Sequence, residues 1–228
     1  MSVSPEPGLA DRIAEVRERI ESACQRAGRD SATVTLIAVT KTWPAPAVVV
    51  AMERGLFDFG ENRVQEAIPK MDLVRELCSD GVQPAWHFIG HLQSNKVKSI
   101  SGRFAILHGV DSERLLEGVA RSAAQPQRIM LEVNVAGEAS KFGIPPTEVG
   151  RLVDAAARCP NVVVQGLMTV APQGQPDAAR AVFRRLRALG KTHALPSLSM
   201  GMSDDFEIAI EEGATHIRVG RAIFGARS

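Results

Sequence analysis

The sequence lacks several features that would place it quickly in a class. It has no tyrosine and only three cysteines, and its two tryptophans and eight phenylalanines leave it poor in aromatic side chains. The cysteines, at positions 24, 78 and 159, are odd in number and far apart, which argues against a disulfide framework and against a zinc knuckle. No stretch approaches the roughly 18 uninterrupted apolar residues of a membrane-spanning helix. The first twenty residues also lack the basic-then-apolar order of a signal peptide, so we expect a cytoplasmic protein.

Net charge is also almost absent. The 27 Lys and Arg residues nearly balance 26 Asp and Glu residues, which leaves a formal charge of +1. Proteins that bind nucleic acid or membrane surfaces concentrate positive charge, so neither partner is expected. An apolar fraction of 45% in 228 residues excludes global disorder and is enough for one domain with a full core.

Apolar runs and helical patterns alternate along the chain after a first helical pattern at residues 9–24. We expect strands at residues 34–39, 56–59, 86–89, 104–110, 129–135, 162–168, 197–199 and 215–219. The expected helices between them are 44–54, 61–77, 94–99, 112–124, 146–159, 177–189 and 204–212, with a short final helix from Ala222. Pro69 should kink or split the helix at 61–77. About eight strand–helix units favour a (β/α)₈ barrel, with a doubly wound parallel sheet as the alternative.

His87 and His91 are four residues apart, a spacing that suits two metal ligands on a helix. Here the spacing falls on an expected strand and turn, and no cysteine or carboxylate accompanies the pair locally. We therefore expect a packing or hydrogen-bonding role for these histidines and no metal site.

Lys41 follows the apolar strand 34–39 and reaches the end of a barrel where ligand chemistry is usually found. Desolvation there would lower the pKa of the ammonium and make a neutral amine available for a Schiff base. A lysine that simply extends into solvent is the alternative.

A second feature is the loop 199–203, which follows the seventh expected strand, together with Gly220 after the eighth. Loops at these two positions form the recurrent phosphate site of (β/α)₈ barrels, and Gly201 and Gly220 would let the backbone approach an anion closely. Asp204 and Asp205 would repel a phosphate unless they cap the next helix, and the loop could be no more than a helix cap. A Schiff-base lysine and a phosphate cradle on opposite sides of a pocket together describe pyridoxal 5′-phosphate (PLP).

Seven segments then carry a family resemblance: AVTK (38–41), FGENRVQE (59–66), WHFIG (86–90), LQSNK (92–96), GLM (166–168), SMGMSDD (199–205) and RVGRAIFG (218–225). In this combination and order, from Leu36 to the C-terminus, the sequence resembles the pyridoxal phosphate homeostasis protein family. The resemblance implies a barrel similar to the N-terminal domain of alanine racemase, one domain over residues 1–228 with the helix within 1–28 packed on the barrel.

The resemblance also implies a cofactor site. PLP would form a Schiff base with Lys41, Arg218 would face the pyridine nitrogen, and His87 would lie near the ring pocket. The residues expected to bind PLP are Lys41, Asn62, Met168, Ser199, Gly201, Met202, Ser203, Arg218 and Gly220, with no catalytic residue among them. Members of this family hold PLP and regulate its intracellular supply without turnover, so the implied partners are PLP and apo-enzymes that need it. We expect a monomer.

An amino-acid racemase that uses PLP is the alternative function. A racemase needs a second base opposite the lysine, and related enzymes take a tyrosine from another domain. This chain has no tyrosine, which leaves His87 or Cys78 as candidates. A cationic Arg218 at the ring nitrogen would also weaken the cofactor as an electron sink. An aldolase-type barrel that uses Lys41 without PLP is a third hypothesis.

Overall fold

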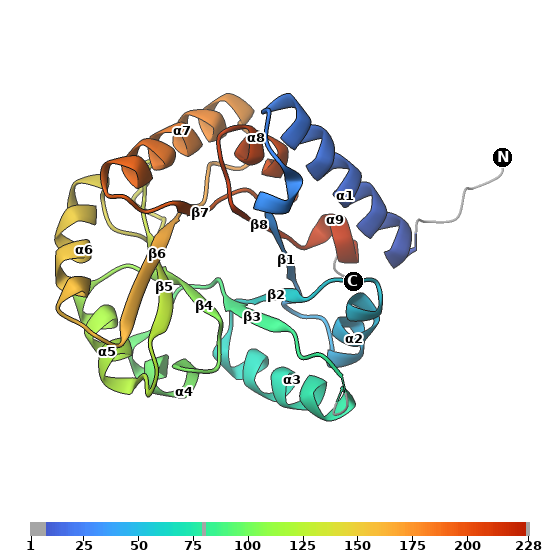
Figure 1. Ribbon diagram of the computed structural model, residues 1–228, viewed down its shortest axis with the longest axis horizontal. Coiled ribbons are helices and arrows are strands. Elements are labelled where there is room, and N and C mark those ends of the chain that lie inside the picture. The colour runs from blue at the N-terminus through green and yellow to red at the C-terminus, as the bar shows by residue number, and fades with distance from the viewer. Residues whose placement is uncertain (1–7, 79–80, 227–228) are drawn as a thin grey trace.

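Eight parallel strands close into a barrel surrounded by helices (Figure 1). This arrangement comes from a computed structural model that describes residues 8–78 and 81–226. The strands are β1 (Thr35–Val39), β2 (Asp58–Glu61), β3 (Ala85–Phe88), β4 (Ile106–Val110), β5 (Gln127–Glu132), β6 (Val162–Met168), β7 (Ser197–Ser199) and β8 (His216–Val219). Each strand pairs with the next one along the chain, and β8 pairs with β1 to close the barrel. The barrel, and not the doubly wound sheet, is therefore confirmed.

Helices cover the outside of the barrel. They are α1 (Leu9–Arg26), α2 (Ala45–Glu53), α3 (Val64–Leu77), α4 (Val97–Ile100), α5 (Glu113–Ser122), α6 (Val149–Ala157), α7 (Pro176–Thr192), α8 (Phe206–Glu211) and α9 (Arg221–Phe224). Three short 3₁₀ turns lie at Ser31–Thr33, Ser94–Lys96 and Pro146–Glu148.

The first helix packs against the last two, α8 and α9, outside the place where β8 meets β1 (Figure 1). Its apolar face, with Ile13, Val16 and Ile20, is buried as its spacing predicts. Arg12 adds a hydrogen bond from Nε to the backbone oxygen of Ile223 at 2.7 Å. The sequence predicted one domain over residues 1–228. Residues 1–7, 79–80 and 227–228 lie outside the described residues, so the limits of this domain stay a prediction.

Several elements differ from the sequence prediction: β5, for example, spans Gln127–Glu132, whereas residues 129–135 were predicted. β2 begins at Asp58 and includes Gly60 and Glu61, whereas the sequence predicted residues 56–59. The apolar pattern predicted the wrong bounds for β2 because the strand includes a charged residue. Glu61 is fully buried and forms an ion pair with Lys70. The helix α3 runs through Pro69 without a break, so the predicted split is wrong. One missing backbone donor is outweighed by the buried face of the helix.

Close contact between β6 and β7 depends on one glycine. A Cβ atom built on Gly166 would lie 1.8 Å from the backbone oxygen of Ser197, so no other residue fits there without separating the strands. This contact sets the position of Ser199 at the end of β7, because the paired register runs from Ser197 to Ser199.

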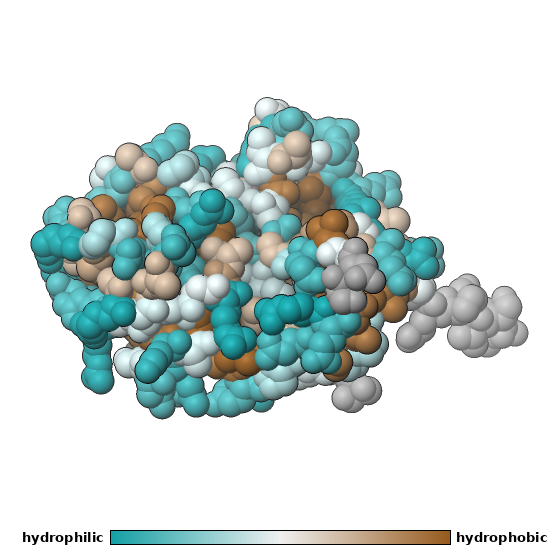
Figure 2. Space-filling model, turned by 60° about the horizontal axis from the view of Figure 1, so that its bottom comes forward, coloured by the Kyte–Doolittle hydropathy of each residue, from teal (hydrophilic) through white to brown (hydrophobic). Residues whose placement is uncertain are grey.

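Hydrophilic side chains dominate the face of the molecule drawn in Figure 2, and hydrophobic ones show there in small separate groups. Scattered apolar exposure of this kind is normal for a globular surface. None of the helices in the described part of the chain is both long enough and apolar enough to cross a membrane.

Candidate cofactor-binding site

The residues that the sequence singles out gather at one end of the barrel, because all eight strands run in parallel and end there. Lys41 and Asn62 follow β1 and β2, Met168 and Ser199 end β6 and β7, and the remaining predicted residues belong to β8 or to the loops after β7 and β8: Gly201, Met202, Ser203, Arg218 and Gly220.

The turn that carries Lys41 is anchored on both sides. Before it, the backbone oxygen of Thr40 accepts a hydrogen bond from Nζ of Lys70 at 2.7 Å. After it, the backbone N–H of Thr42 donates to the carboxylate of Glu66. Thr42 has a φ of 70°, a left-handed conformation that is costly for a β-branched residue. The helix α3 therefore holds the backbone at Lys41 in a strained and defined position.

A buried polar cluster supplies these anchors. The ammonium of Lys70 contacts Oε1 of Glu61 at 2.6 Å and Oε1 of Glu66 at 3.0 Å, and the hydroxyl of Thr40 donates to Oε1 of Glu61 at 2.7 Å. With the Thr40 backbone oxygen, the three donors of the ammonium have three acceptors. Burial raises the pKa of Glu61, although Lys70 and Thr40 oppose the rise. Burial would also raise the pKa of Glu66, but the bonds from Lys70 and Thr42 outweigh it and lower that pKa.

A second buried network crosses the barrel interior from β2 to β8. Its hydrogen bonds join Asp58 Oδ1 to His87 Nε2 (3.0 Å), His87 Nδ1 to His108 Nε2 (3.1 Å), His108 Nδ1 to Ser199 Oγ (2.9 Å), and Ser199 Oγ to Arg218 Nη1 (2.6 Å). Asp58 begins β2 at the opposite end of the barrel from Lys41, so the network spans the barrel lengthwise.

The direction of each bond follows from the two ends of this network. Arg218 can only donate and an ionised Asp58 can only accept. Burial and the neighbouring cationic groups lower the pKa of His108 well below its usual range, so its imidazole is neutral. When Nε2 of the neutral His108 donates to Nδ1 of His87, Nδ1 of His108 accepts a hydrogen bond from the hydroxyl of Ser199, and Arg218 donates to that hydroxyl. The hydroxyl of Ser199 is then hydrogen-bonded to His108 and Arg218 inside the barrel. The role of Ser199 in phosphate binding stays a prediction.

Arg218 is buried, with only 5% of its surface exposed. Its second terminal nitrogen, Nη2, donates to the backbone oxygen of Thr169 at 2.9 Å. Burial lowers the pKa of Arg218 to about 10, with Glu132 and Asp205 opposing the shift, so the guanidinium stays charged at neutral pH. Burial raises the pKa of Glu132 to about 7, Asp111 adds to that rise, and Arg218 opposes it. The predicted position of Arg218 at a pyridine nitrogen stays a prediction.

The loop after β7 can be built only with glycine at position 201. Gly201 has a φ of 93°, and a Cβ atom there would lie 2.6 Å from Cβ of Ala209 and 2.9 Å from Cα of Phe206. Across the next loop, a Cβ on Gly220 would lie 3.3 Å from the backbone oxygen of Val39. Gly220 thus brings the loop after β8 close to the end of β1, and Gly201 brings the loop after β7 close to α8.

The acidic residues of this loop are both engaged elsewhere. The Asp205 carboxylate accepts a hydrogen bond from the backbone N–H of Met202 at 2.5 Å, and Asp204 is paired with Arg221. The hydroxyl of Ser203 accepts from the backbone N–H of Ala222 at 3.3 Å, which ties the two loops together. Neither carboxylate caps α8, so that expectation is wrong, but the partners of both within the two loops reduce the repulsion that they would exert on an anion.

Asn62 and Met168 occupy different surroundings. Oδ1 of Asn62 is buried and has no hydrogen-bond partner among the described residues, so a donor from a ligand would satisfy it. Met168 is 1% exposed and packs with Ile106 and Met130 inside the barrel. Its contact with a cofactor ring stays a prediction.

Sequence reasoning missed the residues that hold the site in place. Lys70 lies on the apolar face of its helix, beside Ala67, Met71 and Val74, and a lysine in that register could have been recognised as buried. His108 lies within an apolar run in the same way. Neither pattern indicates which partner it meets.

Comparisons with known proteins agree with this fold. A profile of the family "Alanine racemase, N-terminal domain" matches residues 12–228. A pyridoxal phosphate homeostasis protein from Pseudomonas aeruginosa is 45% identical over 225 residues, covering 96% of each chain. The structure of PipY from Synechococcus elongatus with PLP bound is 34% identical, has a TM-score of 0.81, and is matched over 96% of this chain and 100% of PipY.

More distant structures share the fold alone. Alanine racemase from Corynebacterium glutamicum, 20% identical with a TM-score of 0.69, is matched over 96% of this chain but only 61% of the racemase. By contrast, the homeostasis proteins are matched over nearly their full length. The chain therefore belongs to the pyridoxal phosphate homeostasis protein family, which shares the alanine racemase N-terminal domain.

Proposed function

We propose that this protein binds pyridoxal 5′-phosphate at the carboxyl end of its barrel, covalently through Lys41, and serves intracellular PLP homeostasis without turnover. The observation that carries the proposal is the anchored turn at Lys41, where Lys70 and Glu66 fix the backbone on both sides of the amine. The names of its relatives and the PLP-bound structure of PipY support the same assignment.

The residues present fit this cofactor. When bound, PLP supplies an aldehyde that reacts reversibly with an amine, and a ring that withdraws electrons. Lys41 offers the amine, while Gly201 and Gly220 pack closely against α8 and β1 and so fix the backbone of the two loops that would face the phosphate. The buried, unpartnered Oδ1 of Asn62 would accept a hydrogen bond from the ligand. Met202 and Ser203 complete the loop that we assign to the phosphate.

The site favours holding PLP over using it for racemisation. Arg218 is cationic at neutral pH, and a cation beside the ring nitrogen would disfavour its protonation. Both ring nitrogens of His87 are already hydrogen-bonded within the barrel. Cys78 caps the far end of α3, on the side of the barrel away from Lys41. Neither residue is placed to act as the second base that a racemase requires.

Borohydride trapping tests the covalent assignment. Purified protein is reduced with borohydride, digested and mapped by mass spectrometry, and its visible absorbance is recorded before reduction. We expect the cofactor mass on the peptide containing Lys41, and loss of both signals in Lys41→Ala but not in the exposed control Lys191→Ala. If Lys41→Ala kept the absorbance and the mass appeared on another lysine, the assignment would be wrong.

Exchange of the α-hydrogen of amino acids tests the absence of turnover. In deuterated water, we expect no exchange beyond that given by free PLP at the same concentration. Exchange that saturates with one amino acid and disappears in Lys41→Ala would instead establish an isomerase.

Delivery of PLP to apo-enzymes, a monomeric state and a cytoplasmic location complete the proposal. Reactivation of a PLP-dependent apo-enzyme by the loaded protein, faster than release of PLP into buffer permits, would support direct delivery. Light scattering coupled to gel filtration should give a mass near 24.5 kDa, and fractionation of cells should recover the protein with cytoplasmic markers.

A further inference from the structure

Three potential metal ligands meet at the carboxyl ends of β3, β4 and β5. Asp111 directly follows β4, Glu132 is the last residue of β5, and His91 lies in the loop after β3. One ligand atom from each of the three lies within 4.8 Å of the others. Their positions in the sequence are 20 or more residues apart, so no local spacing motif indicates this grouping.

Glu132 is the member of this group that most needs a partner. It is 8% exposed, and its Oε2 atom has no hydrogen-bond partner among the described residues. A buried carboxylate without a donor is unfavourable unless a proton or a cation compensates its charge. Gly109 lies beside this oxygen, since a Cβ atom built there would be 3.4 Å from it.

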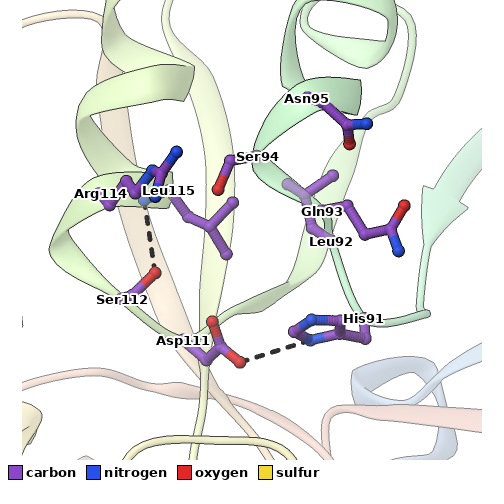
Figure 3. Close-up of a pocket in the computed structure, with 9 residues that line it drawn as sticks. All are labelled: His91, Leu92, Gln93, Ser94, Asn95, Asp111, Ser112, Arg114 and Leu115. Atoms are coloured by element: carbon purple, nitrogen blue, oxygen red, sulfur yellow. Dashed lines mark hydrogen bonds and ion pairs between the residues drawn. The ribbon is translucent and has the colours of Figure 1, made fainter.

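His91 is held in an orientation that suits a ligand. Its ring stacks on Phe142, with centroids 3.9 Å apart and planes inclined by 13°. Its Nδ1 atom lies 3.4 Å from Oδ2 of Asp111, a separation suited to two atoms that share one cation. Stacking on one face leaves the edge of the imidazole directed at the carboxylate, as Figure 3 shows for these two side chains.

A cavity gives access from outside to two of the three ligands, His91 and Asp111. It has a volume of about 480 Å³, and His91 and Asp111 lie at one end of it, away from Asn95 and Arg114 (Figure 3). Gln93 and Ser94 add further polar groups to its wall. An entry path and open space beside the ligands are what a metal site with open coordination positions requires.

We propose that His91, Asp111 and Glu132 bind a first-row divalent cation of the Zn²⁺ type, with its remaining coordination positions open to the cavity. One imidazole nitrogen favours such a cation over Mg²⁺ or Ca²⁺, which take oxygen ligands almost exclusively. Two carboxylates balance its charge, and three protein ligands are the usual complement of an open site. The site goes beyond PLP binding and requires neither Lys41 nor the cofactor.

Binding of Co²⁺, followed by its visible absorbance, tests the proposal on the full-length protein. The variants are Glu132→Gln, which keeps the shape but removes the charge, and His91→Ala. His193→Ala, at the end of α7, is the matched control for loss of a histidine. We expect one equivalent of Co²⁺ that Zn²⁺ displaces, affinity at least about ten-fold weaker in the two site variants, and no change in the control.

Either of two results would overturn the metal site. One is binding by the wild type no tighter than by His91→Ala, and the other is affinity unchanged by Glu132→Gln in variants whose circular dichroism matches the wild type. The measurement is made with and without PLP, because the proposal predicts Co²⁺ binding in both. Failure of PLP binding would therefore leave this test intact.

Discussion

Replacement of Lys70 by methionine should destabilise the protein far more than loss of one lysine from the surface. The side chain of Lys70 is 5% exposed and that of Glu61 is fully buried. Without the ammonium, Glu61 keeps only the hydroxyl of Thr40 as a donor. Removing one partner of a buried ion pair typically costs about 3–5 kcal/mol, because the other charge stays buried and uncompensated. We expect a loss of that size in the free energy of unfolding of Lys70→Met, a large fraction of the stability of a typical domain.

Removal of the unpaired charge of Glu61 should recover much of the lost free energy of unfolding. In the double variant that combines Lys70→Met with Glu61→Gln, no ion remains buried, and we expect it to be more stable than Lys70→Met alone. The difference between Lys70→Met and the wild type should also shrink at acid pH. In the variant the folded pKa of Glu61 lies above its unfolded value, so the penalty is relieved when the carboxyl takes a proton.

Urea unfolding at neutral pH, followed by tryptophan fluorescence and circular dichroism, measures these effects. Lys98→Met, at an exposed position of α4, is the matched control and should change the free energy of unfolding by less than about 0.5 kcal/mol. A loss below about 1 kcal/mol in Lys70→Met would refute the reasoning, since surface ion pairs contribute no more than that. A double variant as unstable as Lys70→Met would equally show that the charge of Glu61 is not the cause.

Three further predictions concern the barrel interior. Burial lowers the pKa of His216 to about 4 and that of His108 well below its usual range. Protonation of either imidazole therefore destabilises the fold as the pH falls below about 6.5, and urea titrations should show a loss from His216 alone of about 2 kcal/mol at pH 5. Gly166→Ala places a methyl group 1.8 Å from the oxygen of Ser197 and should lower the free energy of unfolding by about 3 kcal/mol, seen as a lower thermal midpoint. Ser199→Ala removes the hydroxyl between an imidazole and a buried guanidinium, and should cost about 1–3 kcal/mol in the same assay.

The fold could be predicted from the sequence because its signals are local. Each strand is a short apolar run, and a parallel barrel requires such runs to alternate with helices. The error in the bounds of β2 arises because its buried charge depends on a contact that is not local in sequence. Glu61 lies in a strand because Lys70 pairs with it, and a charged residue whose partner is nine positions away has no local signature.

The site could be predicted only in part. Lys41, Gly201 and Gly220 could be placed at the carboxyl end of the barrel because strand ends and glycine loops have fixed meanings in a barrel. The supporting contacts could not be found, because they join residues far apart in sequence. The hydrogen bond between His108 and Ser199 spans 91 positions, and that between Thr40 and Glu61 spans 21. Such pairs follow from strand order and register, which composition and periodicity do not specify.

The two buried networks explain how the site can be rigid although it is built from loops. One holds the backbone around Lys41, and the other holds the guanidinium of Arg218 between Ser199 and the backbone of Thr169. The first network thus positions the backbone that carries the amine of Lys41, and the second positions the guanidinium of Arg218. Both are in place before a ligand arrives, so the free energy of binding need not include the cost of ordering them. Neither network supplies a second base, and the sequence has no tyrosine to serve as one. Rigid anchors at both sides suit a protein that retains its ligand.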